Sequence, residues 1–416
     1  MQKNLHIFMR RPDGQRSVVG RLLHERQADG TILSYFRYEP GWLADATAFP
    51  LDPVNLPLES RVFRRRSRTG LWGVMEDALP DAWGRRLLQA RHSMDVSRSN
   101  NIELLLLTGW AEPGATGFAE SAAMPGHTVV PMDMDRTEQA ILASESFEKD
   151  ADTISLPDFF ISGGSSAGGA RPKVLARSGT ALYLVKFPSI NDPAPDIMAN
   201  LEAFGLSCAR EAGIPVPEFF TVRAASGRVA LAVRRFDTSG GQGRIHFMSL
   251  QSLVDSEEQL GLPYARMAEM VRLVSADPER DIHALFKQMV VNIIICNRDD
   301  HLKNFSMLLD PASRGFRLTP AYDLVPNLWQ RQHVLSVAGK ISDIGRDDLV
   351  QEGRRFALSG QRTRRLIDEA ATGVAAALAE NRQRLARLAA DHALCRRLLE
   401  QVRENLAAIA SRGTTA

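Results

Sequence analysis

Apolar and polar residues alternate from residue 1 to about 70, in short runs that glycine and aspartate turns separate. Examples are Leu5–Met9 and Ile32–Phe36, and this period of two predicts β-strands. Beyond this region apolar residues recur at intervals of three and four, which predicts helices over Glu76–His92 and Asn101–Thr108. Pro80 would lie in the first turn of the earlier helix, where proline is tolerated. The N-terminal part is therefore predicted to combine strands with two helices.

A second strand-rich unit is predicted further along the chain. Lys173–Arg177 and Ala181–Phe187 are largely apolar runs on either side of a Ser-Gly-Thr turn, which is the composition of a β-hairpin. A helix over Met198–Ala212 follows, and Gly213 and Pro215 end it in the order typical of helix C-termini.

The rest of the chain is predicted to be mostly helical. From Ser249 onward the helical spacing dominates, and leucine and alanine form an apolar stripe through the last part of the chain. Residues 110–155, rich in glycine, proline, alanine and acidic residues, are predicted to be a connecting region. We therefore divide the chain into three domains, residues 1–120, 150–245 and 246–416.

The composition is that of an ordinary soluble protein, with 44% hydrophobic and 24% charged residues. A formal net charge of +2 gives no general reason to expect nucleic-acid binding. The three cysteines form no CxxC pair, which argues against a disulfide framework and a zinc site. The N-terminus lacks the apolar core of a signal peptide, and no apolar run approaches the roughly 18 residues that span a bilayer. We expect a cytoplasmic protein without a membrane partner.

The most informative segment of the chain is Asn297–Asn304. It follows the apolar run Val290–Cys296 and contains five potentially charged side chains within six positions. Such a turn beside a buried segment is costly unless metal, substrate or hydrogen bonds satisfy its charges. Arg298 and Asp299, four further residues and then Asn304 match the catalytic loop of kinase-like phosphotransferases. In that loop the aspartate takes the proton of the acceptor hydroxyl and the asparagine holds magnesium.

A phosphotransfer site must also cradle and anchor the nucleotide phosphates, and two segments are candidates for these tasks. Ser162–Lys173 is rich in glycine, whose backbone approaches phosphate oxygens closely, although a flexible linker would have the same composition. It is neither a Walker A loop nor a GxGxxG loop. Lys186 ends an apolar strand and needs an anionic partner, a phosphate or a carboxylate such as Glu202, unless it reaches solvent. Glu202 considered alone would more often be a surface residue.

Two further segments complete the order of parts that kinases use. Ala230–Asp237 joins the strand-rich and helical parts, where a hinge would bind adenine through backbone groups; a plain interdomain strand is the alternative. Asp323, within Leu318–Leu324, follows the catalytic loop where kinases place their main magnesium ligand. Asp323 and Asn304, with Asp299 available, provide the hard oxygen ligands that Mg²⁺ prefers.

Two other charged clusters have simpler explanations. The adjacent residues Asp299, Asp300 and His301 could bind a transition metal, but one turn rarely offers three adjacent residues to one ion. A basic run could contact the phosphates of DNA or tRNA, although a solvated hairpin tip is the simpler explanation. This run consists of Arg61, Arg64, Arg65, Arg66 and Arg68.

Together these segments resemble the HipA family of toxin kinases, and the resemblance extends over nearly the whole chain. NRDDHLKNF is similar to the family's catalytic segment, and LTPAYDL to its magnesium segment. SSAGGARPK, YLVKFPS and LAVRRFD are similar to its phosphate loop, nucleotide-lysine strand and hinge. LPDAWGRRLL and WLADATAFPLDPVNLPL resemble the extra subdomain of full-length members. The resemblance implies an α+β chain with a bilobal protein-kinase-like fold, an extra N-terminal β-rich subdomain and an all-helical C-lobe.

The resemblance also implies a serine/threonine protein kinase that uses ATP and Mg²⁺. Asp299 would be the catalytic base, assisted by Lys303, and Asn304 and Asp323 would bind Mg²⁺. Lys186 would hold the α- and β-phosphates. The residues that would surround the nucleotide are Ser166, Gly168, Gly169, Lys173, Lys186, Glu202, Arg234, Phe236, His301 and Tyr322.

An inhibitory modification and specific partners follow from the same resemblance. Ser166 corresponds to the serine that family members phosphorylate on themselves, and Ser165 is the other candidate. Members phosphorylate translation proteins such as aminoacyl-tRNA synthetases, and a HipB-like helix-turn-helix antitoxin neutralises them and mediates any contact with DNA. Arg234 departs from the family, since an acidic residue is often found at the hinge. The alternatives are a small-molecule kinase of the aminoglycoside or choline type and an antitoxin-bound transcriptional co-repressor with little kinase activity.

Overall fold

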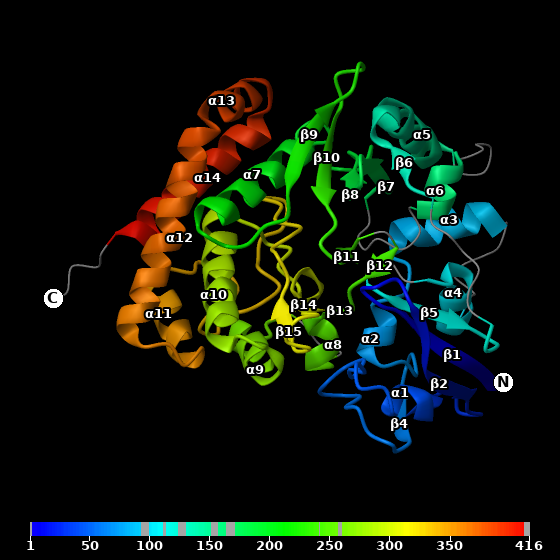
Figure 1. The fold of residues 1–416 in the computed structure, drawn as a ribbon. Helices are drawn as coiled ribbons and strands as arrows, with labels where there is room; N and C mark the ends of the chain where they lie inside the picture. Colours follow the sequence, from blue (N-terminus) through cyan, green and yellow to red (C-terminus); the bar gives the residue numbers. More distant parts are fainter. Residues whose placement is uncertain are drawn as a thin grey trace. The chain divides into compact units, whose positions relative to one another are not determined.

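The computed structural model describes residues 2–92, 100–110, 114–123, 130–150, 157–163, 171–240, 242–256 and 260–411, without the side chains of residues 161–163 (Figure 1). The chain divides into two compact units. Unit 1 comprises Met1–Ser189, Arg234–Asp255 and Met307–Phe316, and unit 2 comprises Ile190–Val233, Ser256–Ser306 and Arg317–Ala416. The three-domain division proposed above stays a prediction.

Unit 1 begins with a five-stranded antiparallel sheet of order β4-β3-β2-β1-β5. Its strands are β1 (Gln2–Arg10), β2 (Arg16–Arg26), β3 (Ile32–Tyr38), β4 (Phe63–Ser67) and β5 (Thr116–Ala119). A bulge between Ile7 and Phe8 interrupts the alternation, so that both residues and the following Met9 are fully buried. At Gly20 an added Cβ would lie 2.4 Å from the Phe36 ring, so this close packing requires glycine. The predicted N-terminal strands are confirmed.

One of the two predicted N-terminal helices is confirmed and the other is partly wrong. α4 (Asn101–Thr108) has the predicted bounds, and Asn100 and Glu103 form a capping box at its start. The helix predicted over Glu76–His92 is instead two helices, α2 (Gly73–Glu76) and α3 (Ala82–His92). Pro80 lies between them because proline disfavours helical geometry in the residue before it and cannot donate a helical hydrogen bond.

The prediction that residues 110–155 only connect two units is wrong. This region contains β5, β6 (Met132–Asp133), a short 3₁₀ turn and the helix α5 (Thr137–Lys149). In α5 the buried stripe includes Ala140 and Ser144, and Ser144 Oγ donates to the Ile141 carbonyl. Small and polar residues on the buried side hide the apolar period on which the prediction relied.

The remaining elements of unit 1 include the predicted hairpin. β7 (Lys173–Ser178) and β8 (Ala181–Lys186) are antiparallel neighbours, and β6 runs parallel to β7. The short helices are α1 (Pro40–Leu43), α6 (Asp158–Gly163) and α8 (Leu250–Val254), and the short strands β11 (Thr238–Ser239) and β12 (Gly243–Arg244) form a ribbon.

Unit 2 is built mainly from long helices. They are α7 (Met198–Glu211), α9 (Tyr264–Val274), α10 (Pro278–Ile295), α11 (Arg346–Arg355), α12 (Gly360–Glu380), α13 (Arg382–Asp391) and α14 (Ala393–Ala410). Helix α12 packs against both α7 and α10. At Gly205 in α7, an added Cβ would lie 2.1 Å from the backbone carbonyl oxygen of Leu324. The strands β9 (Phe219–Arg223) and β10 (Val229–Arg234) form an antiparallel pair.

The predicted all-helical C-lobe needs a correction. Residues 246–416 contain the strands β13 (Phe247–Ser249), β14 (Ser306–Leu309) and β15 (Phe316–Leu318) besides the helices. Strands of three or four residues are too short to show a period of two in the sequence. None of the described helices is both long and apolar enough to cross a lipid bilayer.

Candidate phosphotransfer site

The predicted catalytic segment starts where the buried helix α10 ends. Cys296, the C-cap residue of α10, has a φ of 57° in the left-handed region that terminates helices. Asn405 of α14 donates its side-chain amide to the carbonyls of Ile293 and Ile294, both at 3.2 Å. Because the last carbonyls of a helix lack the usual donor four residues further on, this contact fixes the end of α10 and the direction in which the chain leaves it. Burial raises the pKa of the Cys296 thiol, so it stays neutral beside the site.

Asn304 is folded back onto the predicted catalytic base. Its Nδ2 atom donates to the backbone carbonyl of Asp299 at 2.7 Å, and its backbone N–H donates to the His301 carbonyl at 2.9 Å. The Asp299 side chain is 51% exposed, and its Oδ1 lies 3.8 Å from His301 Nε2. The segment therefore presents the Asp299 side chain to solvent. The amide nitrogen of Asn304 is bound to the Asp299 carbonyl, so the amide oxygen is the atom that can face a cation.

Tyr322 ties the predicted magnesium segment to the catalytic segment. Its hydroxyl donates to the Lys303 carbonyl at 2.7 Å and lies 2.5 Å from Ser306 Oγ. Asp323 follows with a φ of 58°, a left-handed conformation that aspartate tolerates better than most residues. The hydrogen bond between Tyr322 and Lys303 thus joins the two neighbours of the predicted Mg²⁺ ligands. Asp323 directly follows Tyr322, and Asn304 directly follows Lys303.

The adjacent carboxylates of Asp299 and Asp300 point apart. Asp299 is half exposed, whereas the Asp300 side chain has no exposed surface and faces the interior. A metal held by the adjacent residues Asp299, Asp300 and His301 is therefore inconsistent with this geometry, because two of the three side chains face opposite ways.

In unit 1, the predicted nucleotide residue Lys173 is buried against a carboxylate. Lys173 is 2% exposed, and its Nζ lies 2.9 Å from Oδ2 of Asp81. The other oxygen of Asp81 accepts the Gly84 N–H at 2.7 Å, as an N-cap residue of α3 does. Lys186 lies directly opposite Lys173 in the β7–β8 ladder. Sequence reasoning missed Asp81, although aspartate immediately before a helical pattern is a recognisable N-cap signal.

The predicted hinge contains a buried ion pair. Arg235 Nη2 lies 2.5 Å from Asp237 Oδ2, and the same carboxylate accepts the Gly114 N–H at 2.7 Å. Burial alone would raise the pKa of Asp237, but the Arg235 guanidinium and these hydrogen bonds hold it below its ordinary value. Arg234 is exposed at the end of β10, and the Phe236 ring lies 6.5 Å from that of Phe247.

The remaining predicted residues differ in what the structure describes. Glu202 in α7 is 4% exposed, so it is not a surface residue. The predicted phosphate-loop residues Ser166, Gly168 and Gly169, with the alternative Ser165, lie outside the described residues.

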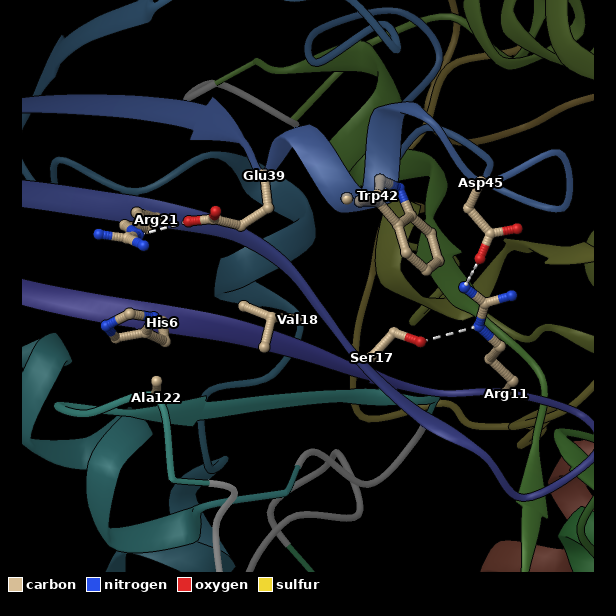
Figure 2. Close-up of a pocket in the computed structure, with 10 residues that line it drawn as sticks. His6, Arg11, Ser17, Val18, Arg21, Glu39, Trp42, Asp45 and Ala122 are labelled. Atoms are coloured by element: carbon tan, nitrogen blue, oxygen red, sulfur yellow. Dashed lines mark hydrogen bonds and ion pairs between the residues drawn. The ribbon is translucent and has the colours of Figure 1, made fainter.

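A cavity of about 360 Å³ in unit 1 contains none of the predicted site residues (Figure 2). Its charged lining residues face one another: Arg11 pairs with Asp45, and Arg21 pairs with Glu39. Arg11 also lies over the Trp42 ring at 4.8 Å. Because both guanidinium groups already face carboxylates, the cavity has no obvious preference for an anionic ligand.

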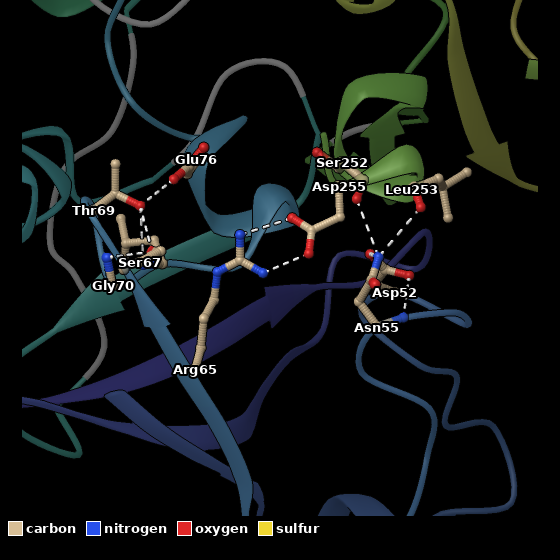
Figure 3. A network of polar contacts seen from close by, with 11 residues as sticks. Asp52, Asn55, Arg65, Ser67, Thr69, Gly70, Glu76, Ser252, Leu253 and Asp255 are labelled. Atoms are coloured by element: carbon tan, nitrogen blue, oxygen red, sulfur yellow. Dashed lines mark hydrogen bonds and ion pairs between the residues drawn. The ribbon is translucent and has the colours of Figure 1, made fainter. Parts of the chain in front are cut away.

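The basic run lies largely on an edge strand rather than at a hairpin tip. Arg65 in β4 forms two hydrogen bonds with the Asp255 carboxylate, at 2.6 and 2.7 Å (Figure 3). Arg66 pairs with Asp29 at 3.0 Å, and Arg61 pairs with Glu59 at 2.7 Å. These three arginines are therefore partly neutralised, and they give no support to a nucleic-acid surface.

Comparisons with known proteins identify two family domains and several relatives. The chain matches the HipA N-terminal domain over residues 14–119 and the HipA-like C-terminal domain over residues 165–378. It is 27% identical over 346 residues to "Putative kinase Y4mE" of Sinorhizobium fredii, covering 74% of each chain. It is 27% identical over 271 residues to "Toxin YjjJ" of Escherichia coli, covering 60% of this chain and 57% of that protein.

A solved structure shares the fold across almost the whole chain. This is HipA of Shewanella oneidensis MR-1 in a complex with HipB and operator DNA, with a TM-score of 0.71, 20% identity, and coverage of 97% of this chain and 98% of that one. The likeness confirms the predicted α+β fold class, apart from the strands corrected above. Because the HipA-like C-terminal domain matches more than half of the 416 residues, and the HipA N-terminal domain matches most of the region before it, the chain belongs to the HipA family.

Proposed function

We propose that this chain is a HipA-like serine/threonine protein kinase, which transfers the γ-phosphoryl group of ATP to a hydroxyl of a protein. Two hydrogen bonds carry the proposal: Asn304 donates to the Asp299 carbonyl, and Tyr322, next to Asp323, donates to the carbonyl of Lys303, next to Asn304. They combine an exposed carboxylate with an asparagine whose amide oxygen can face a cation. The family resemblance and a relative described as a kinase support the same function.

In this proposal each residue has one task. Asp299 accepts the proton of the acceptor hydroxyl as that oxygen attacks the γ-phosphorus, and the bond to the β–γ bridging oxygen of ATP breaks. Lys186 holds the α- and β-phosphates by its charge, and Lys303 and His301 assist near the catalytic segment. Buried Nδ1 of His301 has no hydrogen-bond partner among the described residues, and a ligand atom could satisfy it.

The proposed Mg²⁺ site fits the chemistry of its residues. Asn304 and Asp323 offer an amide oxygen and a carboxylate, which are hard ligands, and Asp299 offers a second carboxylate. Bound Mg²⁺ would neutralise charge on the phosphate oxygens. The left-handed backbone of Asp323 is the kind of local strain that is often found at functional sites.

The test is phosphate transfer from labelled ATP with Mg²⁺ by the purified full chain. Asp299→Asn and Asp323→Asn should each lower the rate about 100-fold or more, and chelation of the metal should abolish transfer. Asp391→Asn, on the exposed end of α13, is the matched control and should keep full activity. Unchanged labelling in both site variants would remove this assignment.

A helix-turn-helix antitoxin is the proposed partner. The Shewanella oneidensis HipA structure contains HipB and operator DNA, and the likeness to it supports a HipB-like partner for this chain. It also favours a second function, repression of transcription as part of an antitoxin complex. Operator binding by the complex that is unaffected by Asp299→Asn would show that repression is separate from phosphate transfer.

The proposed substrate is a translation protein, such as an aminoacyl-tRNA synthetase. Phosphoproteomics after induction, with Asp299→Asn as control, would identify it. A metabolite that accepts phosphate in place of any protein would favour the small-molecule kinase.

We also propose inhibitory autophosphorylation at Ser166. A phosphoserine adds nearly two negative charges, which would oppose ATP binding nearby. Mass spectrometry after incubation with ATP should find phosphate in the wild type and in Ser165→Ala but not in Ser166→Ala. The reverse pattern would assign the modification to Ser165.

A further inference from the structure

Asp300, directly after the proposed catalytic base, is a fully buried carboxylate with three hydrogen-bond partners. Its Oδ2 accepts the Tyr264 hydroxyl at 2.6 Å and lies 3.1 Å from Nδ1 of His333. Its Oδ1 accepts the backbone N–H of Val334 at 2.8 Å. The side chain has 0% exposure, and its partner His333 is only 6% exposed. No part of the proposed mechanism uses this residue.

The partners of Asp300 come from distant parts of unit 2. Tyr264 begins helix α9, whereas His333 and Val334 lie in the loop before α11. The Tyr264 hydroxyl also accepts a hydrogen bond from Nδ2 of Asn292, at 3.2 Å, near the end of α10. Burial, and after it the Asp300 charge, raise the pKa of Tyr264 well above its ordinary value, so the hydroxyl stays a donor.

A buried carboxylate of this kind fixes the backbone that carries it. A buried charge without hydrogen-bond donors is strongly unfavourable, so Asp300 cannot move away from Tyr264, His333 and Val334 without a large loss of stability. Asp299 is joined to Asp300 by one peptide bond and points the other way. Its position is therefore set from inside the protein, while its side chain reaches the exposed surface where a substrate could approach.

We propose that Asp300 is a positioning residue, whose buried hydrogen bonds hold Asp299 in the geometry required for phosphoryl transfer. This inference rests on the proposed kinase function. Asp299 acts mainly on the acceptor during transfer, whereas Lys186 and the main Mg²⁺ ligands Asn304 and Asp323 hold the nucleotide in the proposed site. Loss of the anchor should therefore lower kcat and leave the KM for ATP nearly unchanged.

The test compares kcat and the KM for ATP in the full-length wild type, Asp300→Asn and Asp300→Ala. A displaced catalytic group of this kind commonly costs about 10- to 100-fold in rate, and the alanine variant should lose more because the amide keeps one acceptor oxygen. The KM for ATP should change by less than about twofold. Tyr264→Phe, which removes one donor and leaves the carboxylate, should lower kcat by less than either variant.

Asp281→Asn is the matched control. Asp281 is also a buried carboxylate of unit 2, at 4% exposure, but it lies in the first turn of α10 and accepts from Arg317 and the Leu318 N–H. If kcat falls equally in this variant, the loss of any buried carboxylate has the same effect. That result would overturn the positioning role of Asp300. So would an unchanged kcat in both Asp300 variants.

A second measurement is independent of catalysis. Amide hydrogen exchange at Val334 should be faster in Asp300→Ala than in the wild type, because its acceptor is gone. Unchanged exchange at Val334 would overturn the anchor. Absence of phosphate transfer by the wild type, together with faster exchange in the variant, would reject the proposed kinase function and retain Asp300 as the anchor of this segment.

Discussion

Asp300 in unit 2 and Asp81 in unit 1 are both carboxylates beside predicted site residues. The Asp300 side chain has no exposed surface and that of Asp81 is 14% exposed, and different groups satisfy them. Asp300 is bound by a hydroxyl, an imidazole and a backbone N–H. Asp81 faces the ammonium group of Lys173 at 2.9 Å and caps α3 with its other oxygen. A hydroxyl, an imidazole and a backbone N–H thus satisfy one carboxylate, and an ammonium group faces the other.

The carboxylate of Asp81 also compensates neighbouring positive charges, which the hydrogen bonds around Asp300 do not do. Lys173 and Lys186 are direct partners in the antiparallel β7–β8 ladder, so their side chains leave the same face of the hairpin. Like charges at directly opposite positions of a ladder repel each other unless anions compensate them. Asp81 supplies one such charge. The comparison teaches that loss of one partner should harm a pair more than it harms a network.

The largest expected effect is that of Asp81→Asn. This change removes the carboxylate that faces the buried Lys173 ammonium. Breaking a buried pair from one side costs about 3–5 kcal/mol, and we expect the lower end of this range because Asp81 is 14% exposed. The free energy of unfolding in urea, followed by tryptophan fluorescence, should fall by that amount. Four of the five tryptophans lie in unit 1, so fluorescence reports mainly on the unit that contains the pair.

The double variant Asp81→Asn with Lys173→Met sharpens this prediction. It removes both charges, and a buried pair replaced by uncharged groups of similar volume is often close to neutral in stability. Most of the loss should therefore be recovered. A double variant as unstable as Asp81→Asn would mean that the unpaired charge does not account for the loss, since asparagine can still cap α3.

The network around Asp300 should respond less to the loss of one partner. Tyr264→Phe removes one donor from Asp300 and one acceptor from Asn292, while His333 and Val334 keep their bonds. We expect a fall of about 2 kcal/mol in the free energy of unfolding, followed by circular dichroism of the helices. A loss as large as that of Asp81→Asn would contradict the idea that a network spreads the cost.

A buried histidine of unit 1 gives a comparable effect that depends on pH. Burial lowers the pKa of His246 to about 4, against an ordinary value of 6.5, although its hydrogen bond to the Leu51 carbonyl raises it in part. The folded protein therefore favours neutral His246, and the stability that this provides is complete above pH 6.5 and is lost as the pH falls toward 4.

The wild type should accordingly lose about 2 kcal/mol more than His246→Gln between pH 7 and pH 5. Urea unfolding of both proteins at the two pH values measures this difference. Equal pH dependence in the two proteins would show that His246 does not carry it.

The smallest effect is expected from a pair near the surface. Arg65 and Asp255 form a two-fold hydrogen-bonded ion pair, but their side chains are 19% and 31% exposed. Arg65→Gln should cost less than about 1 kcal/mol, and high salt should reduce the difference from the wild type further. A salt-independent loss of several kcal/mol would mean that this pair contributes as much to the free energy of unfolding as the pair of Lys173 and Asp81.

Local signals in the sequence predicted the elements that depend on local interactions. The helix Asn101–Thr108 has its capping residues three positions apart, and the hairpin of β7 and β8 has a turn between two largely apolar runs. The spacing of Asp299 and Asn304 was informative because both lie in one segment, where Asn304 bonds back to the Asp299 backbone.

Contacts between distant segments could not be predicted in the same way. Asp81 and Lys173 are 92 positions apart, and Asp300 and His333 are 33 apart, so neither pair leaves a periodic pattern in the sequence. Lys173 was predicted to bind nucleotide because it ends a glycine-rich segment; that its ammonium group is buried beside Asp81 follows only from the packing of α3 against other parts of unit 1.

The close approach at Gly205 has a consequence for the evolution and engineering of this chain. The helix α7 touches the carbonyl of Leu324, the residue after Asp323, only because position 205 lacks a side chain. A larger residue at position 205 would therefore push Leu324 away from α7, directly beside the proposed metal ligand Asp323. A change at this one apolar position would in this way shift the backbone that carries Asp323, the proposed Mg²⁺ ligand, without altering any polar group of the proposed site.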